Sequence, residues 1–215
     1  MATSKKIFFF GEDHLTAGLA LSLVRGTIIG QISEPARKKI RESHQTVLRI
    51  VEIGQPVYGI NTGFGPLCTT KISKTETKTL QNNILQSHSV GVGPPIETEM
   101  AKLMLVLKAH SLAKGFSGIA EATLDRIIWH IDNDAIPIVP SQGSVGASGD
   151  LAPLSHLFLP LVGLGKVRYI RKTITTAQLH RIYGLEPLEL GPKEGLALIN
   201  GTQFIAAHAV MVIDK

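Results

Sequence analysis

The sequence predicts a mostly α-helical fold with minor β structure, and three observations support this prediction. Apolar residues recur at the spacing of one helix face in several long segments. Clusters of glycine and proline separate these segments, as they do at helix ends and in turns. Hydrophobic residues make up 44% of the chain but aromatic residues only 5%, so the core must be largely aliphatic, which suits helix packing.

The first long helix is expected over residues 34–53. Ser33 is a suitable N-cap, and Pro35 fits the first helical turn. Gly54 and Pro56 then end the helix. One face is expected to be buried, and it carries Ile40, His44, Val47, Leu48 and Val51.

Further helices follow along the chain. The second is expected to begin after Ser73, which forms an S-x-x-E capping box with Glu76, and to run to about His88. The others are expected over 97–114, over 119–132, from 150 onward, and from 193 to the end with an interruption at 200–201. Their expected buried residues are Met100, Leu103, Met104 and Leu107, then Leu124, Ile127, Ile128 and Ile131, then Leu154, Leu157, Phe158 and Leu161.

The β structure is expected to be small. A short strand is expected near residues 6–10 and a hairpin at 166–174, while the rest of residues 1–32 shows a mixed pattern. Three glycines and a proline make 57–66 a loop. A second glycine- and proline-rich stretch breaks the chain and places a soft internal boundary near 91–96.

Composition and charge argue against several classes of protein. The formal net charge is +5, but the lysines and arginines are scattered and not interleaved with aromatic residues, which argues against nucleic-acid binding. The single cysteine, Cys68, allows no internal disulfide and indicates a reducing, cytoplasmic location. No apolar run is expected to span a membrane, and no spacing of ligands predicts a metal site.

The stretch at 143–150 (GSVGASGD) is the most unusual part of the sequence. It is not a nucleophile elbow, because Asp150 stands where G-x-S-x-G needs its last glycine. One interpretation is a flexible linker or tight turn. The other is chemical: Gly149 has no Cβ, so its nitrogen can approach the Ala147 carbonyl. Closure of that bond with loss of water makes an imidazolone ring, and dehydration of Ser148 leaves an electrophilic exocyclic methylene.

The segment at 143–156 (GSVGASGDLAPLSH) resembles the signature of the aromatic amino acid ammonia-lyases. Three other segments resemble motifs of the same family in the same order, and the four motifs together span residues 58–203. These three are 58–65 (YGINTGFG), Ser87-His88 followed by Gly91-Val92-Gly93, and 194–202 (EGLALINGT). The resemblance implies the N-terminal part of the helical histidine ammonia-lyase fold.

The resemblance also implies how the catalytic residues act. Ala147, Ser148 and Gly149 would form 4-methylidene-imidazole-5-one (MIO), whose methylene takes up the substrate so that ammonia leaves. Tyr58 would be the base that removes the β-proton, for which its pKa near 10 would need lowering or transient activation. Asn200 would bind the MIO oxygen or the amine and assist cyclisation. The plain alternatives are an ordinary half-buried tyrosine and an Asn-Gly turn.

The remaining candidates bind substrate or support the triad. His88 would face the substrate ring, where histidine or tyrosine offers a polar edge and phenylalanine would leave a buried polar group unpaired. Gly65, with Gly63, would give the tyrosine loop its mobility next to the substrate. Asp150 would start the helix after the triad, where a carboxylate suits the helix N-terminus, and would support cyclisation. For His88 the alternative is a satisfied core histidine.

The resemblance implies deamination of histidine to trans-urocanate and ammonia, with no metal or diffusible cofactor. It also implies that residues 1–215 are the N-terminal portion of a protein more than twice as long, with sites built from several subunits of a homotetramer. Alone, this portion would expose apolar helix faces and would be inactive. The alternatives are a tyrosine ammonia-lyase giving coumarate, an aminomutase, and a non-catalytic scaffold of the same fold.

Overall fold

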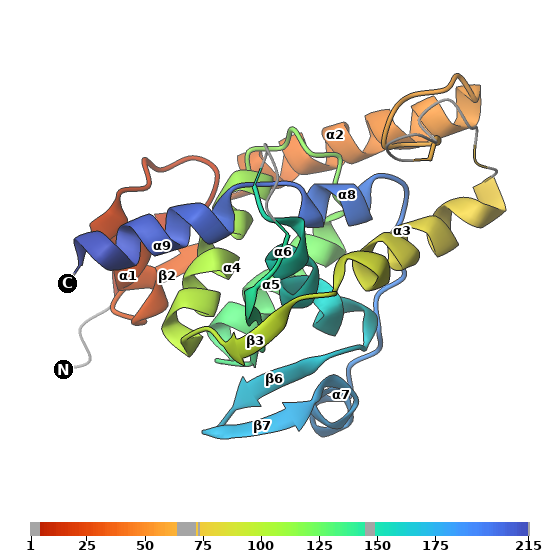
Figure 1. Ribbon diagram of the computed structural model, residues 1–215. Helices are drawn as coiled ribbons and strands as arrows, with labels where there is room; N and C mark the ends of the chain where they lie inside the picture. The colour runs from red at the N-terminus through yellow and green to blue at the C-terminus, as the bar shows by residue number, and fades with distance from the viewer. Residues whose placement is uncertain (1–4, 64–71, 73, 145–148, 215) are drawn as a thin grey trace.

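The computed structural model describes residues 5–63, 72, 74–144 and 149–214, and it confirms a mostly α-helical fold (Figure 1). The helices are α1 (Ala17–Val24), α2 (Glu34–Ile53), α3 (Lys74–His88), α4 (Thr98–Leu112), α5 (Glu121–Asp132), α6 (Leu151–Phe158), the 3-10 helix η2 (Leu159–Val162), α7 (Thr176–Tyr183), α8 (Glu194–Ile199) and α9 (Gln203–Ile213). The strands are β1 (Ile7–Phe9), β2 (Ile29–Gln31), β3 (Val92–Pro95), β4 (Ile136–Pro137), β5 (Pro140–Gln142), β6 (Lys166–Tyr169) and β7 (Lys172–Thr175).

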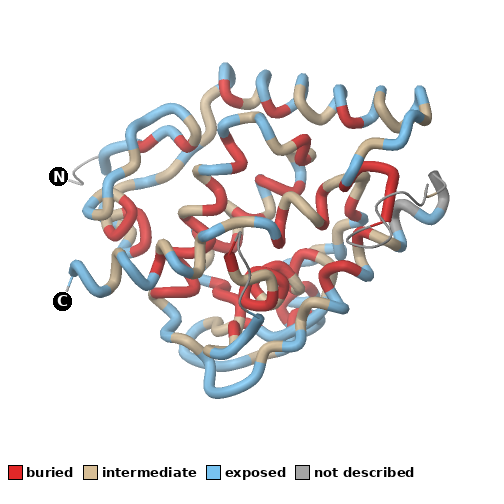
Figure 2. The backbone as a smooth tube through the Cα atoms, turned by 45° about the horizontal axis from the view of Figure 1, so that its top comes forward, coloured by how far each residue is buried: buried red, intermediate tan, exposed pale blue. Residues whose placement is uncertain are grey.

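Helix α2 has the predicted bounds, because both of its ends are encoded locally. The Ser33 hydroxyl accepts a hydrogen bond from the Ala36 amide at 3.2 Å, and Gly54 ends the helix with a left-handed φ of +74°. The predicted buried face is too wide, however. Val47 is buried but Leu48 is 39% exposed. Figure 2 shows buried positions only along the inner side of α2, which lies at the edge of the molecule and is covered from one side.

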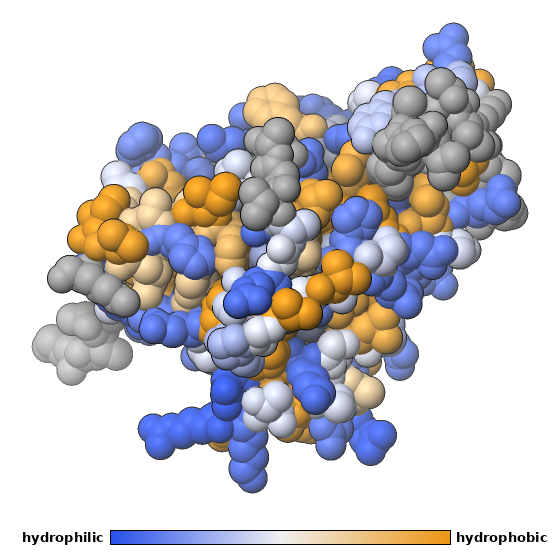
Figure 3. Space-filling view, in the orientation of Figure 1, coloured by the Kyte–Doolittle hydropathy of each residue, from blue (hydrophilic) through white to orange (hydrophobic). Residues whose placement is uncertain are grey.

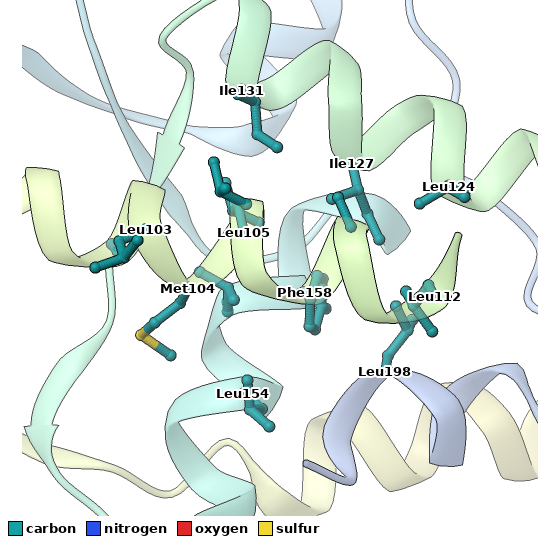
Figure 4. Close-up of a cluster of buried hydrophobic side chains, with 14 of the residues drawn as sticks. Leu103, Met104, Leu105, Leu112, Leu124, Ile127, Ile131, Leu154, Phe158 and Leu198 are labelled. Atoms are coloured by element: carbon teal, nitrogen blue, oxygen red, sulfur yellow. The ribbon is translucent and has the colours of Figure 1, made fainter. Parts of the chain in front are cut away.

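Helix α4 is the centre of the fold. The prediction of one buried stripe is incomplete, because Leu103, Met104, Leu105 and Val106 follow one another and are all 0–1% exposed. Leu107, which was expected inside, is only partly buried. In Figure 4 the side chains of α4 lie between those of α5 and those of α6 and α8. A helix covered on most of its circumference shows no amphipathic period.

Helices α5 and α6 bury most of the residues expected of them. Leu124 and Ile127 of α5 are 0% exposed, although Ile128 is only partly buried. The four apolar residues expected to be buried after residue 150 are all 2% exposed or less. At α3, the last residue is His88 as predicted, while Ser73 of the expected capping box lies outside the described residues.

The described strands form three small sheets. β1 pairs with β2 in parallel, β3 with β5 antiparallel, and β4, β6 and β7 form an antiparallel sheet that contains the predicted hairpin. Several elements were not anticipated, among them the short strands β2, β4 and β5. The segment expected to break the chain is strand β3, in which two prolines and a glycine hide the β pattern. α1 is short and gains its stability from packing on α4. α7 begins with a capping box between Thr175 and Gln178, which is a local signal for its N-terminus.

Helices α8 and α9 form an apolar C-terminal pair broken at residues 200–202. By length and composition alone, Glu194–Ile213 is long and apolar enough to cross a membrane. The expectation that the chain has no apolar run of this kind was therefore wrong. α8 and α9 are separate helices, and α9 packs on α4 through the buried Ala207. The outer side of α9 exposes Ile205, Val212 and Ile213. Figure 3 shows apolar side chains gathered over this helix.

Candidate active site

The site begins where Gly149 touches the break between α8 and α9. Gly149 is buried and has a φ of +114°, which side chains other than that of glycine rarely allow. A Cβ at this position would collide with the carbonyl oxygen of Gly201 and would lie 3.3 Å from the Cα of Thr202. Two motifs more than fifty residues apart are therefore in direct backbone contact, and only glycine fits between them.

Asn200 is the C-cap of α8. Its main-chain N–H donates to the Leu196 carbonyl at 3.0 Å, and its φ of −84° and ψ of 117° are extended. The alternative of an Asn-Gly turn of the hairpin type is therefore excluded, because such a turn needs positive φ at both residues. The carbonyl of Asn200 accepts a hydrogen bond at 2.9 Å from the Nζ of Lys108, a buried residue of α4. The residue itself is exposed.

Asp150 occupies the N-cap position of α6, as expected, but it does not cap the helix. Its side chain makes no capping hydrogen bond. One carboxylate oxygen, Oδ1, is buried and has no hydrogen-bond partner among the described residues. A buried acceptor without a donor is costly in a folded protein. Helix capping therefore does not explain this carboxylate, which directly follows the triad.

His88 ends α3 with a defined ring orientation. Its Nδ1 lies 2.9 Å from the Ile84 carbonyl and 3.1 Å from the Ser87 hydroxyl. A carbonyl only accepts, so Nδ1 carries a proton. In the neutral ring this leaves Nε2 as an acceptor, suited to an N–H or O–H on a bound ring.

His156 of α6 holds the segment that follows His88. Its Nε2 accepts a hydrogen bond from the Gly91 amide at 3.0 Å. Burial lowers the pKa of this half-buried imidazole, which keeps the ring neutral and able to accept. A Cβ at Gly91 would lie 3.1 Å from the Gln142 carbonyl oxygen and 3.2 Å from the His156 ring. The start of strand β3 is therefore fixed directly against α6.

Tyr58 lies in the turn after α2 and is 57% exposed. The buried side chain of Asn61 anchors the chain around it. Its Oδ1 accepts from the Val57 amide at 2.8 Å, and its Nδ2 donates to the Gln55 carbonyl at 2.8 Å. The loop is thus held from the inside while the tyrosine faces outward.

Three of the candidate residues lie on helices that pack together. Helices α3, α6 and α8 pack on one another, and they carry His88, Gly149 and Asn200 at or next to their ends. The connection between α2 and α3 starts at the far end of α2, away from the break between α8 and α9 (Figure 1). Tyr58 lies in this connection. Ala147, Ser148 and Gly65 lie outside the described residues.

This arrangement of helices and glycine-dependent contacts defines a class of protein. The chain belongs to the aromatic amino acid lyase family, whose model matches residues 15–215. The backbone at Gly149 fits the MIO of this family, because ring closure at the triad needs a residue without a Cβ at this position.

Among individual proteins, the chain is similar to histidine ammonia-lyases. The one from Shouchella clausii is 46% identical over 189 residues, which are 88% of this chain and 38% of that enzyme. The structure of histidine ammonia-lyase from Trypanosoma cruzi has a TM-score of 0.87 at 36% identity, over 97% of this chain and 40% of that one. The tyrosine aminomutase from Streptomyces globisporus has a TM-score of 0.88 at 32% identity, over 98% and 39%. The chain thus spans about two fifths of these relatives.

Three contributors to the site were missed by sequence reasoning, namely Lys108, His156 and Asn61. Lys108 had a usable signal, since it falls four residues after Met104 and eight after Met100 in the predicted buried stripe. A lysine at a core position of an apolar helix points to a special role. For His156 and Asn61 the motifs were recognised, but no local pattern shows which backbone groups their side chains bind.

Proposed function

We propose that the full-length protein is a histidine ammonia-lyase that converts histidine to trans-urocanate and ammonia without oxidation. The similarity to histidine ammonia-lyases carries this proposal, because relatives with that name are 41–47% identical to the chain. The fold alone does not discriminate, since a tyrosine aminomutase matches it equally well. The acceptor at His88 Nε2 supports a substrate ring with a polar hydrogen, such as imidazole.

The chain's residues have distinct roles in this proposal. MIO, formed from Ala147, Ser148 and Gly149, supplies the electrophilic carbon that makes the amino group a better leaving group. Asn200 directs its amide to the triad, and Asp150 supports cyclisation with the carboxylate that does not cap α6. His88 binds the substrate ring, and Gly65 also takes part in substrate binding. Tyr58 takes the β-proton. We also propose that the protein is located in the cytoplasm.

A near-ultraviolet assay of the full-length protein tests this function. Urocanate and coumarate both absorb where their parent amino acids scarcely do, so histidine and tyrosine are offered separately. We expect product from histidine, and loss of nearly all of it in Ser148→Ala. Product from tyrosine alone would replace the proposed substrate. If Ser148→Ala keeps its activity, the triad chemistry is excluded. If neither substrate gives product, an aminomutase or a non-catalytic scaffold is favoured.

We further propose that the full-length protein is a homotetramer in which one subunit provides the tyrosine of a site and another provides its triad. The exposed apolar side of α9 offers a surface for such assembly or for the remainder of the chain. Tyr58→Phe and Ser148→Ala proteins should each be inactive. Co-expressed in equal amounts, they should recover activity at about a quarter of the sites, because random assembly pairs an intact tyrosine with an intact triad. A mixture as inactive as its components would place both groups in one chain.

A further inference from the structure

Lys108 is a buried lysine that packing does not explain. It lies near the C-terminal end of α4 and is 2% exposed. An apolar side chain of similar length would occupy the same space without the cost of burying an amine or ammonium. Among the described residues no carboxylate pairs with Lys108, and burial lowers its pKa to about 7.

The hydrogen bond of Lys108 links the core to the candidate site. Its Nζ lies 2.9 Å from the carbonyl oxygen of Asn200. Helix α8 ends at Ile199, so the Asn200 carbonyl lies beyond the last helical residue and needs a donor from elsewhere. Nζ supplies this donor across 92 positions of sequence. The next residue, Gly201, directs its own carbonyl against Gly149.

We propose that Lys108 is a positioning residue, which holds the Asn200 main chain so that the Asn200 amide and the Gly149 backbone meet in the geometry that cyclisation and catalysis require. This inference rests on the proposed role of Asn200. In this proposal Lys108 acts on the triad indirectly. It binds the Asn200 carbonyl in the break between α8 and α9, and this break contacts Gly149. A lysine that only filled the core would leave the triad chemistry unchanged once the protein folded.

The full-length protein with Lys108→Met tests this inference. Methionine keeps the length and apolar stem but has no donor. Intact mass measures the fraction of chains that have lost the two waters of cyclisation, and steady-state kinetics measures kcat and KM. We expect a lower cyclised fraction and a fall in kcat of roughly a hundredfold, with KM little changed, because misplacement of a reacting group acts on the chemical step. The matched control is Lys102→Met, on the same helix, whose lysine is paired with Asp134 instead.

A double variant separates positioning from general damage. If Lys108 acts through Asn200, then Lys108→Met with Asn200→Ala should lose no more cyclisation or kcat than Asn200→Ala alone. Additive losses would overturn the inference. So would a folded Lys108→Met protein with normal cyclisation and kcat. If Lys108→Met does not fold, Lys108→Leu, which also has no donor, replaces it, and normal values in that variant overturn the inference equally.

The Asn200→Ala protein distinguishes this inference from the function on which it rests. Defective Asn200→Ala beside a normal Lys108→Met would overturn the role of Lys108 and leave the ammonia-lyase proposal standing. Normal cyclisation and kcat in Asn200→Ala would remove the proposed role of Asn200, and the inference about Lys108 with it.

Discussion

Gly149→Ala in the full-length protein is expected to abolish cyclisation of the triad and to lower activity by more than roughly a hundredfold. Two independent constraints act at this position. The φ of +114° is strained for any residue with a Cβ, and that Cβ would collide with the Gly201 carbonyl. The collision is with backbone, so no side-chain rotation can relieve it. The break between α8 and α9 would have to move away from the triad.

Gly26→Ala is the matched control. Gly26 also has a positive φ, of +66°, but a Cβ there meets nothing within 4 Å. It should therefore lose about 1 kcal/mol of stability from backbone strain while keeping normal cyclisation. Intact mass and the near-ultraviolet assay measure both variants. Full cyclisation in Gly149→Ala would show that the contact with Gly201 is not required.

The second large effect that we expect is a loss of folding stability at low pH, and it arises at His130. His130 is 1% exposed, donates from Nδ1 to the Ala135 carbonyl at 2.7 Å, and leaves its buried Nε2 without a partner among the described residues. Burial is the main cause that lowers its pKa from 6.5 to about 4. Above pH 6.5 the ring is neutral in the folded and unfolded chain alike. As the pH falls toward 4, the unfolded chain binds a proton that the folded chain does not, so stability falls.

The size of this loss follows from the shift in pKa. It amounts to roughly 3 kcal/mol at His130 between pH 6.5 and pH 4. His130→Gln keeps an N–H donor for the Ala135 carbonyl but does not titrate. At one protein concentration, its thermal midpoint should therefore decline less with acid than that of the unaltered protein. Equal declines would show that His130 charges freely in the folded state. His110, His156 and His180, whose pKa values are also lowered, are the same in both proteins.

Much of the fold was predictable because its signals are local. The two ends of α2 depend on Ser33 and Gly54, and the hairpin of β6 and β7 on neighbouring residues. Elements stabilised from a distance were harder. β3 becomes a strand only by pairing with β5, some forty-five residues later, and its prolines argue against it locally. α4 shows no clear stripe because other helices cover most of its circumference.

The sequence by itself determined the family's motifs, the triad with its glycine, and the identity of the candidate residues. Only the tertiary structure decided which of them meet. It brings Gly149 into contact with Gly201, and it joins Lys108 to Asn200 and His156 to Gly91 by hydrogen bonds. The physical reason is that hydrogen bonds and steric exclusion act between neighbours in space. The spacing of apolar residues predicts which face of a helix is buried. It does not predict which backbone carbonyl of another element a buried side chain will bind.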